Sequence, residues 1–141
     1  MNNKLSQQLK DENYCYLTTT GRVTGNPHEI EIWFGHKDNT VYLLSGGRDK
    51  SDWVKNLLKN PSVTLRVGKQ TFKATVRIVE DNKEEMMTRN MLADKYNERT
   101  VRGALSKWAR TALPVAIDLA QEVLQNQRCL NKWKSFHKSL L

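Results

Sequence analysis

The sequence predicts a mainly β protein with flanking helices, in which six antiparallel strands form a small barrel. Two observations predict this class: runs of alternating apolar and polar residues recur along the chain, and tight turns separate most of them. The expected strands lie near residues 14–20, 28–35, 40–45, 62–67, 70–80 and 114–119. Short antiparallel strands joined by tight turns favour a barrel over a sandwich, because a closed barrel has no exposed strand edge. A ferredoxin-like fold would need the order βαββαβ, which the sequence lacks.

The first three strands differ in their patterns. NYCYLTTT is rich in aromatic and β-branched residues. HEIEIWF alternates, with Glu29 and Glu31 on one face and the apolar residues on the other. TVYLLS is apolar on both faces, so we expect it to be a central strand.

The last three strands follow the same logic. SVTLRV and TFKATVRIVE both alternate, and Gly68 and Lys69 between them match a two-residue hairpin turn of the Gly-X type. LPVAIDL comes late in the chain and is the sixth strand.

Helical periodicity appears between these strands. KSDWVKNLLKNP predicts a helix over residues 51–59, with Ser51 as the N-cap. KEEMMTRNMLADKY and TVRGALSKWARTA predict two more helices, over 83–96 and 100–112. The second of these is expected to carry one apolar stripe, made of Val101, Leu105 and Trp108.

Both ends of the chain are expected to be helical. Residues 1–12 form a polar lead-in helix in this prediction. In the C-terminal extension, residues 121–141, Val123, Leu130 and Trp133 share one face of an amphipathic helix. This face is expected to cover either the barrel or a second copy of the chain, which would make a homodimer. No linker or repeat divides the sequence, so residues 1–141 are expected to form a single domain.

Composition narrows the classes of function. The chain has 141 residues of globular composition, and no apolar run reaches the roughly 20 residues of a transmembrane segment. Cys15 and Cys129 are too few for a disulfide framework and are not spaced as metal ligands. We therefore expect a cytoplasmic protein with reduced thiols and no metal site. The net charge of +8 favours an anionic partner, which could be a nucleic acid, a phosphorylated cofactor or an acidic surface.

The stretch TTTGRVTGNP, residues 18–27, carries more anion-binding groups than a hairpin turn needs. Gly21 and Gly25 permit positive φ and a close approach of the backbone to a ligand. Successive amides in such a turn can form a nest for an anion, and Arg22 and the Thr24 hydroxyl add donors suited to phosphate oxygens. A plain hairpin connection is the alternative.

A second stretch, SGGRDKSDW at residues 45–53, leads from a strand through a glycine pair and two cations into a helix. The unpaired amides at a helix start carry partial positive charge, which suits phosphate. An ordinary strand-to-helix loop is the alternative. The spacing does not match a Walker loop, and GRVTG lies between two strands, so it does not match a dinucleotide fingerprint either.

Two such loops in one small domain indicate one extended phosphorylated ligand better than two unrelated sites. If the second and third strands pair, the loops at 21–27 and 45–51 both border the mouth of the barrel.

Three successive segments of the chain resemble the deazaflavin-dependent nitroreductase family, within the split-barrel flavin-binding proteins. The segments are TTTGRVTGNP, EIWF and YLLSGGRDKSDWVKNLLKNPSVTLRVG. The resemblance covers roughly residues 14–80, with a weaker match at 108–119. It implies a six-stranded split β-barrel of the FMN-binding type and a reduced 8-hydroxy-5-deazaflavin coenzyme (coenzyme F-420). It further implies hydride transfer to an electron-poor small molecule such as a quinone or a nitro compound.

The resemblance also implies which residues contact the coenzyme, while no catalytic residue is predicted. The implied cofactor-binding residues are Arg22, Thr24, Gly25, Trp33, Ser45, Gly46, Gly47, Arg48, Lys50, Ser51 and Trp53.

Two positions depart from the family pattern. Members commonly have a lysine where this chain has Val23 and an arginine where it has His28. The loss of two cations leaves FMN, with its single phosphate, as an alternative cofactor. A non-enzymatic barrel that binds nucleic acid is a further alternative, but the aromatic residues show no interleaving with a basic stripe, so no specific nucleic-acid partner is expected.

Overall fold

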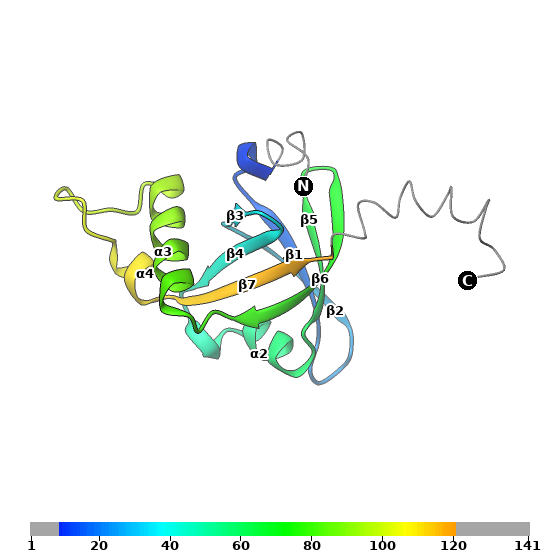
Figure 1. The fold of residues 1–141 in the computed structure, drawn as a ribbon. Helices are drawn as coiled ribbons and strands as arrows, with labels where there is room; N and C mark the ends of the chain where they lie inside the picture. The colour runs from blue at the N-terminus through cyan, green and yellow to red at the C-terminus, as the bar shows by residue number, and fades with distance from the viewer. Residues whose placement is uncertain (1–8, 121–141) are drawn as a thin grey trace.

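The computed structural model describes residues 9–120 and shows an antiparallel sheet of seven strands, curled into a half-barrel (Figure 1). The strand order is β2-β1-β5-β6-β7-β4-β3, and every neighbouring pair is antiparallel. The ladder does not close, because β2 and β3 each have one unpaired edge. The predicted split barrel is confirmed, with seven strands in place of six.

Apart from the predicted strand 28–35 and the predicted helix 100–112, the element bounds agree closely with those expected from the sequence. The strands are β1 (Cys15–Thr20), β2 (Pro27–Ile32), β3 (Gly35–Lys37), β4 (Thr40–Ser45), β5 (Ser62–Val67), β6 (Gln70–Ile78) and β7 (Leu113–Leu119). The helices are the short η1 (Arg48–Lys50), α2 (Asp52–Lys59), α3 (Asn82–Tyr96) and α4 (Lys107–Thr111).

The extra strand arises because the predicted strand 28–35 is broken at Trp33 and Phe34. The amide of Phe34 donates to the hydroxyl of Tyr96 on α3, at 2.9 Å, instead of to a neighbouring strand. The ring of Phe34 is fully buried. The chain therefore leaves one edge of the sheet at β2 and starts the opposite edge at β3.

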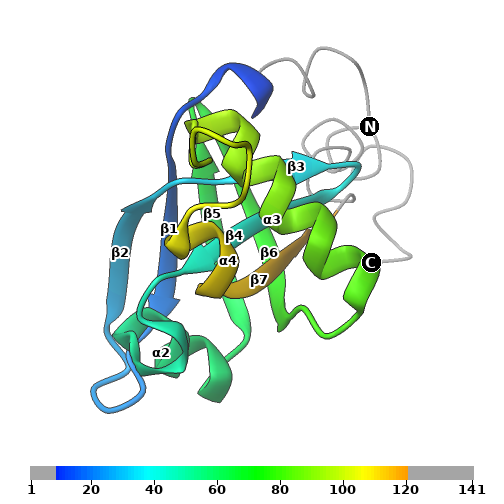
Figure 2. The same cartoon turned by 90° about the vertical axis from the view of Figure 1, so that its left-hand side faces the viewer.

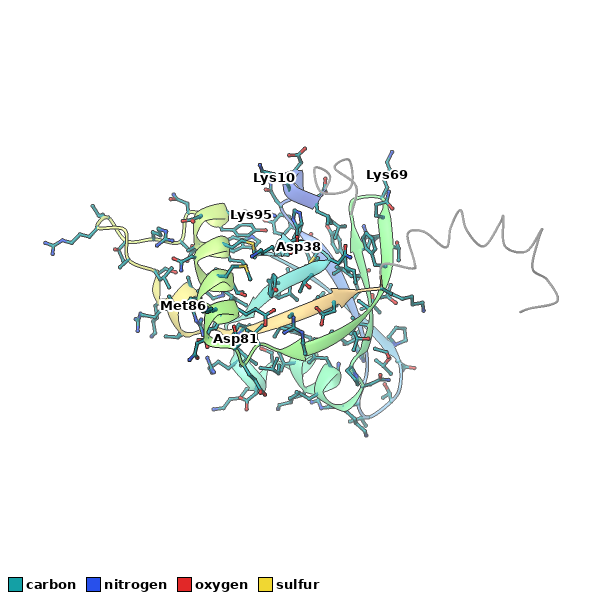
Figure 3. All side chains as sticks on the ribbon, viewed as in Figure 1. Lys10, Asp38, Lys69, Asp81, Met86 and Lys95 are labelled. Atoms are coloured by element: carbon teal, nitrogen blue, oxygen red, sulfur yellow. The ribbon has the colours of Figure 1, made fainter. Side chains whose placement is uncertain are left out.

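The main core lies on the concave side of the sheet. Strand β4 is apolar on both faces because its side chains belong to two different clusters. Val41 and Leu43 join the main core, whereas Tyr42 and Leu44 belong to a second cluster under α3 and α4. Side chains fill the space between α3 and the sheet (Figure 3). The expected central position of TVYLLS is confirmed, since β4 lies between β7 and β3.

The helices occupy two regions. α3 contacts β3, β4, β7 and α4, whereas α2 contacts β1 near the β1–β2 turn (Figure 2). Val54 and Leu57 of α2 are buried, whereas Leu58 is 56% exposed. The buried face of α2 is thus rotated towards Asn56.

The predicted helix over 100–112 is wrong in its first half. Gly103 has φ +90°, and a bridge between Arg99 and Leu105 closes a loop there. The helix begins only at Lys107, after Ser106, whose hydroxyl accepts from the amide of Ala109. Val101, expected on the apolar stripe, lies in the loop and is fully exposed.

Several expectations about the termini lie outside the described residues. Residues 9–11 are helical, but the rest of the lead-in helix and the extension 121–141 are not described. In the described range, no helix is long and apolar enough to cross a membrane. Cys15 is buried there as a free thiol, and burial raises its pKa to about 12.

Candidate functional site

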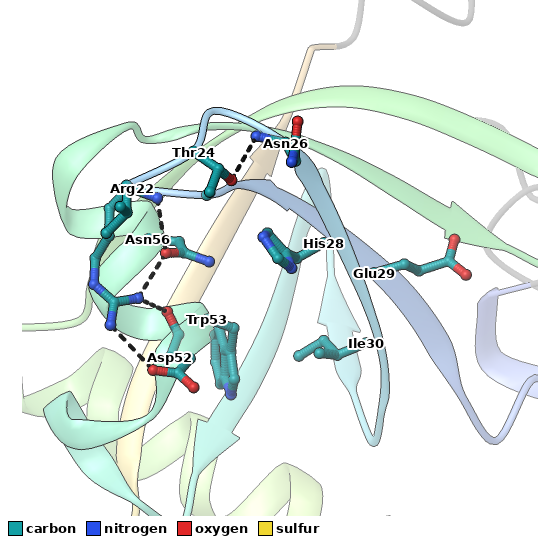
Figure 4. Close-up of a pocket in the computed structure, with 11 residues that line it drawn as sticks. Arg22, Thr24, Asn26, His28, Glu29, Ile30, Asp52, Trp53 and Asn56 are labelled. Atoms are coloured by element: carbon teal, nitrogen blue, oxygen red, sulfur yellow. Dashed lines mark hydrogen bonds and ion pairs between the residues drawn. The ribbon is translucent and has the colours of Figure 1, made fainter.

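A pocket of about 510 Å³ lies between the β1–β2 turn, the edge strand β2 and the start of α2 (Figure 4). We call it the turn pocket. It is lined by Gly21, Arg22, Val23, Thr24, Asn26, His28, Glu29, Ile30, Asp52, Trp53 and Asn56. Three of the residues predicted to contact a cofactor, Arg22, Thr24 and Trp53, are therefore brought together.

Two successive backbone amides of the β1–β2 turn have no protein partner in the part of the chain that the structure describes. Hydrogen bonds inside the turn use the amides of Gly21, Gly25 and Asn26, and Gly25 has φ +78°. Within residues 9–120, the amides of Val23 and Thr24 donate to no protein group. Adjacent free amides in a turn suit an anion. The Thr24 hydroxyl accepts from Asn26 at 3.2 Å, so its own O–H remains able to donate.

Arg22 is held against α2. Its Nη1 donates to Oδ1 of Asn56 at 2.8 Å and, over a longer 3.4 Å, to the carbonyl of Asp52. Its Nη2 forms an ion pair with Asp52 at 3.1 Å. Because a guanidinium has five N–H donors, these three bonds leave two for a ligand. The side chain of Asp52 is 85% exposed, so water screens the pair and Arg22 keeps part of its attraction for an anion.

Asn56 organises this turn, and the sequence analysis did not identify it. It is 5% exposed, and its Oδ1 accepts from both the amide and the guanidinium of Arg22. Its Nδ2 donates to the hydroxyl of Thr19, also buried, at 3.2 Å. A buried amide needs such partners. The signal in the sequence was a polar residue on the apolar face of the predicted helix 51–59.

A second pocket of about 310 Å³ lies further along β2, and we call it the aromatic pocket. It is lined by Tyr14, Glu31, Ile32, Trp33, Leu44, Glu98 and Trp108. Trp33 stacks on Tyr96 with ring centroids 4.3 Å apart and 5° between the planes, and meets Trp108 edge-on at 5.5 Å. These contacts fix Trp33 as a flat wall of the pocket.

Tyr96 is itself anchored. Its hydroxyl lies 2.7 Å from the carbonyl of Asn13 and 2.9 Å from both the amide and the carbonyl of Phe34. Burial raises the pKa of Tyr96 to about 12, so the phenol stays protonated and donates. No local pattern could reveal this role, because the contacts join residues far apart in the sequence.

The two pockets follow one another along β2. His28 and Ile30 line the turn pocket, and Ile32 lines the aromatic pocket. At about 3.3 Å per residue, four residues of strand separate the two ends by roughly 13 Å. The assumed pairing of the second and third strands is wrong, since β2 pairs only with β1 and β4 pairs with β7 and β3. Helix α2, which follows the loop 45–51, lies beside the β1–β2 turn instead.

In the second predicted loop, Ser45 and Ser51 form hydrogen bonds within the loop itself. The hydroxyl of the buried Ser45 donates to the carbonyl of Arg48 and lies 2.9 Å from that of Ser51. A Cβ at Gly47 would approach Ser51 to 2.5 Å, so the loop closes on itself. Ser51 is the N-cap residue of α2, as the sequence predicts, but its side chain forms no capping hydrogen bond.

The other predicted contacts line neither of these two pockets. Gly46 faces Trp108, the Arg48 guanidinium donates to the carbonyl of Thr111, and Lys50 is exposed in η1. Neither pocket includes Gly25, Ser45, Gly46, Gly47, Arg48, Lys50 or Ser51.

Solved structures share this fold at low sequence identity. A conserved hypothetical protein from Mycobacterium tuberculosis is 18% identical with a TM-score of 0.66, covering 86% of this chain and 82% of its own. An F420-H2 dependent reductase is 17% identical with a TM-score of 0.59, covering 74% and 93%. A FAD-binding protein from Mesorhizobium loti is 13% identical with a TM-score of 0.61, covering 86% and 91%.

A family model described as F420H(2)-dependent quinone reductase matches residues 1–120. This match covers most of the 141 residues and confirms the predicted deazaflavin coenzyme and the oxidoreductase class. The chain belongs to the F420H(2)-dependent quinone reductase family.

Proposed function

We propose that this chain reduces a quinone with reduced coenzyme F420, using the turn pocket for the anionic part of the coenzyme and the aromatic pocket for flat rings. One observation supports this most strongly: both pockets are lined by residues of β2. At one end of β2 lies the turn with Arg22 and the two amides that have no protein partner in the described residues, and at the other end lie the stacked rings of Trp33 and Tyr96.

The donor set of the turn pocket fits a phosphate. Two adjacent amides, the Thr24 hydroxyl and the two remaining donors of Arg22 all suit phosphate oxygens. Among the residues that line this pocket, Arg22 is the one arginine or lysine, and Val23 beside it is apolar and 87% exposed. Lys59 lies next to the lining and donates to the carbonyl of Arg22 at 2.9 Å. The residues therefore fit one phosphate group better than a long polyanionic arm.

The protein's own contribution is binding and orientation. When bound, reduced deazaflavin supplies a hydride, which together with one proton converts a quinone to a hydroquinone. Trp33, rigid between Tyr96 and Trp108, provides an apolar surface that excludes water and aligns a planar ring. Glu31 and Glu98 at the edge of the same pocket disfavour acceptors that carry negative charge.

FMN remains the second candidate cofactor. The ion pair between Arg22 and Asp52 and the two departures at Val23 and His28 lower the positive charge of the turn pocket. A cofactor with a single phosphate needs less positive charge in the pocket than a cofactor with a polyanionic arm.

The test is turnover with purified protein. Reduced coenzyme F420 is mixed with menadione, and the oxidation of the coenzyme is followed with and without protein. In parallel, binding of FMN is measured by the fluorescence of FMN. We expect protein-dependent oxidation and, for Trp33→Ala, a rate at least about tenfold lower, corresponding to roughly 1.4 kcal/mol of transition-state stabilisation. Leu58→Ala, at an exposed apolar position on α2, is the control. Oxidation no faster than without protein contradicts the proposal, and tight FMN binding in its place supports the second candidate.

A further inference from the structure

A third pocket, of about 440 Å³, lies at the other end of the sheet from the turn pocket. It is lined by Lys10, Gly35, His36, Met91, Asp94 and Lys95. Lys10 precedes β1, whereas the β1–β2 turn follows it, so the two pockets lie at opposite ends of β1. Figure 3 shows Lys10 and Lys95 near the end of α3 that is distant from Asp81. We call this cavity the lysine pocket.

Lys95 is a half-buried cation that, in the described part of the chain, contacts aromatic rings and not an acidic side chain. Its Nζ lies 3.7 Å from the centre of the Phe34 ring and 5.3 Å from that of Tyr96, and no hydrogen bond or ion pair of Lys95 is formed within residues 9–120. Burial lowers the pKa of Lys95 to about 8. Burial thus disfavours the charged form of Lys95, and an anion in the pocket would offset this effect because it stabilises the charged ammonium.

Within residues 9–120, none of the acidic side chains around the pocket forms an ion pair with Lys95. Burial lowers the pKa of His36, and the charges of Lys95 and Lys10 lower it further, so both lysines act on His36. Asp94 is engaged in an ion pair with Arg99 at 2.7 Å. Glu12 attracts Lys95 through space without forming an ion pair.

The rest of the lining is apolar and shaped by a close helix–strand contact. A Cβ on Gly35 would come within 3.0 Å of the terminal methyl of Met91, so the glycine allows α3 to approach β3. A methionine side chain is flexible and polarisable, and it adapts to apolar ligands. The volume is in the usual range for small-molecule sites, roughly 300–1,000 Å³.

We infer that the lysine pocket binds a small organic carboxylate, with the carboxylate between Lys95 and Lys10 and the apolar body against Met91 and Gly35. This site is separate from the turn and aromatic pockets, and the inference does not depend on the proposed function.

The test uses the full chain labelled with ¹⁵N and a titration with 2-naphthoate, with neutral 2-naphthamide as the matched ligand. We expect naphthoate to shift the amide signals of Gly35, His36 and Lys95 in a saturable way, and naphthamide to bind at least about tenfold more weakly, as loss of a charge-assisted contact implies. Lys95→Met, which keeps the apolar stem over Phe34, is expected to weaken naphthoate binding by a similar factor. Lys83→Met, at an exposed position of the same helix, is the control and is expected to change nothing.

Three results would overturn the inference: equal binding of naphthoate and naphthamide, unchanged naphthoate affinity in Lys95→Met, or shifts confined to the indole signals of Trp33 and Trp108. The comparison of the two ligands on the natural chain needs no variant, so a folding defect in Lys95→Met leaves the test intact. A parallel titration with inorganic phosphate distinguishes a general anion site, in which phosphate shifts the same signals as strongly, from the carboxylate site inferred.

Discussion

Replacing Asn56 with alanine should detach the β1–β2 turn from α2. Asn56 makes three hydrogen bonds in a site that is 5% exposed: two from Arg22 and one to Thr19. At about 0.5–1.5 kcal/mol each, the loss amounts to about 3 kcal/mol, since the Arg22 amide and the Thr19 hydroxyl are left without a partner. For a chain of this length, that corresponds to a decrease in Tm of about 10 °C.

The assay is urea unfolding followed by tryptophan fluorescence, with Lys55→Ala, an exposed position on the same helix, as the control. The control should stay within about 0.5 kcal/mol of the natural chain. Asn56→Ala should also bind the coenzyme more weakly at a temperature where it is fully folded, because Arg22 loses its anchor. If Asn56→Ala is as stable as Lys55→Ala, the argument that this amide organises the turn pocket is wrong.

Two further predictions concern the links between α3 and the sheet. Arg77 and the hydroxyl of Tyr42 hold the pKa of Glu84 at about 2, below its ordinary 4.5, so this carboxylate stabilises the fold above about pH 4.5 and loses that contribution as the pH falls towards 2. Arg77→Met should therefore move the midpoint of acid unfolding to a higher pH, and an unchanged midpoint in circular dichroism would contradict this assignment. Tyr96→Phe leaves the buried amide of Phe34 without its acceptor and should lower the free energy of unfolding by about 1–3 kcal/mol in urea. The Tyr96→Phe variant keeps the aromatic ring, so its stacking on Trp33 should remain. A large change in the tryptophan fluorescence of the folded variant would show that the hydroxyl is also needed for the stacking.

The strands were predictable because side-chain alternation is a local property. SVTLRV and TFKATVRIVE show it: β5 begins at the first residue of its pattern, and β6 begins one residue before its pattern. The break after Ile32 was not predictable, because it depends on Tyr96, which lies 62 residues from Phe34 along the chain. The false helical turn over 100–106 has a local cause that the periodicity hid: Gly103 adopts a positive φ in a loop, and Ser106 is the true N-cap.

The candidate site likewise has a part that the local sequence predicts and a part that depends on contacts between distant segments. The anion-suited turn could be read from two glycines, Arg22 and Thr24, since the relevant groups are neighbours in sequence. The loop 45–51 has the same kinds of residue, but in it Ser45 and Ser51 bond to the loop itself, which only the three-dimensional structure reveals. The aromatic pocket is assembled from β2, β4 and the chain beyond α3, and its stacked rings come from distant segments.

The affinity of Arg22→Ala for reduced coenzyme F420 tests the central claim most directly. Arg22 has two donors free for a phosphate, and a charge-assisted contact contributes about 1.5–3 kcal/mol, so affinity should fall by about one to two orders of magnitude. Unlike a free surface arginine, Arg22 also contacts α2, so a stability loss of about 1–2 kcal/mol is expected and the titration is run well below Tm. Lys37→Ala, an exposed cation on β3 that lines neither pocket, should bind as the natural chain does. Equal affinities for both variants, whether unchanged or equally reduced, would contradict the assignment of the turn pocket to the anionic part of the coenzyme.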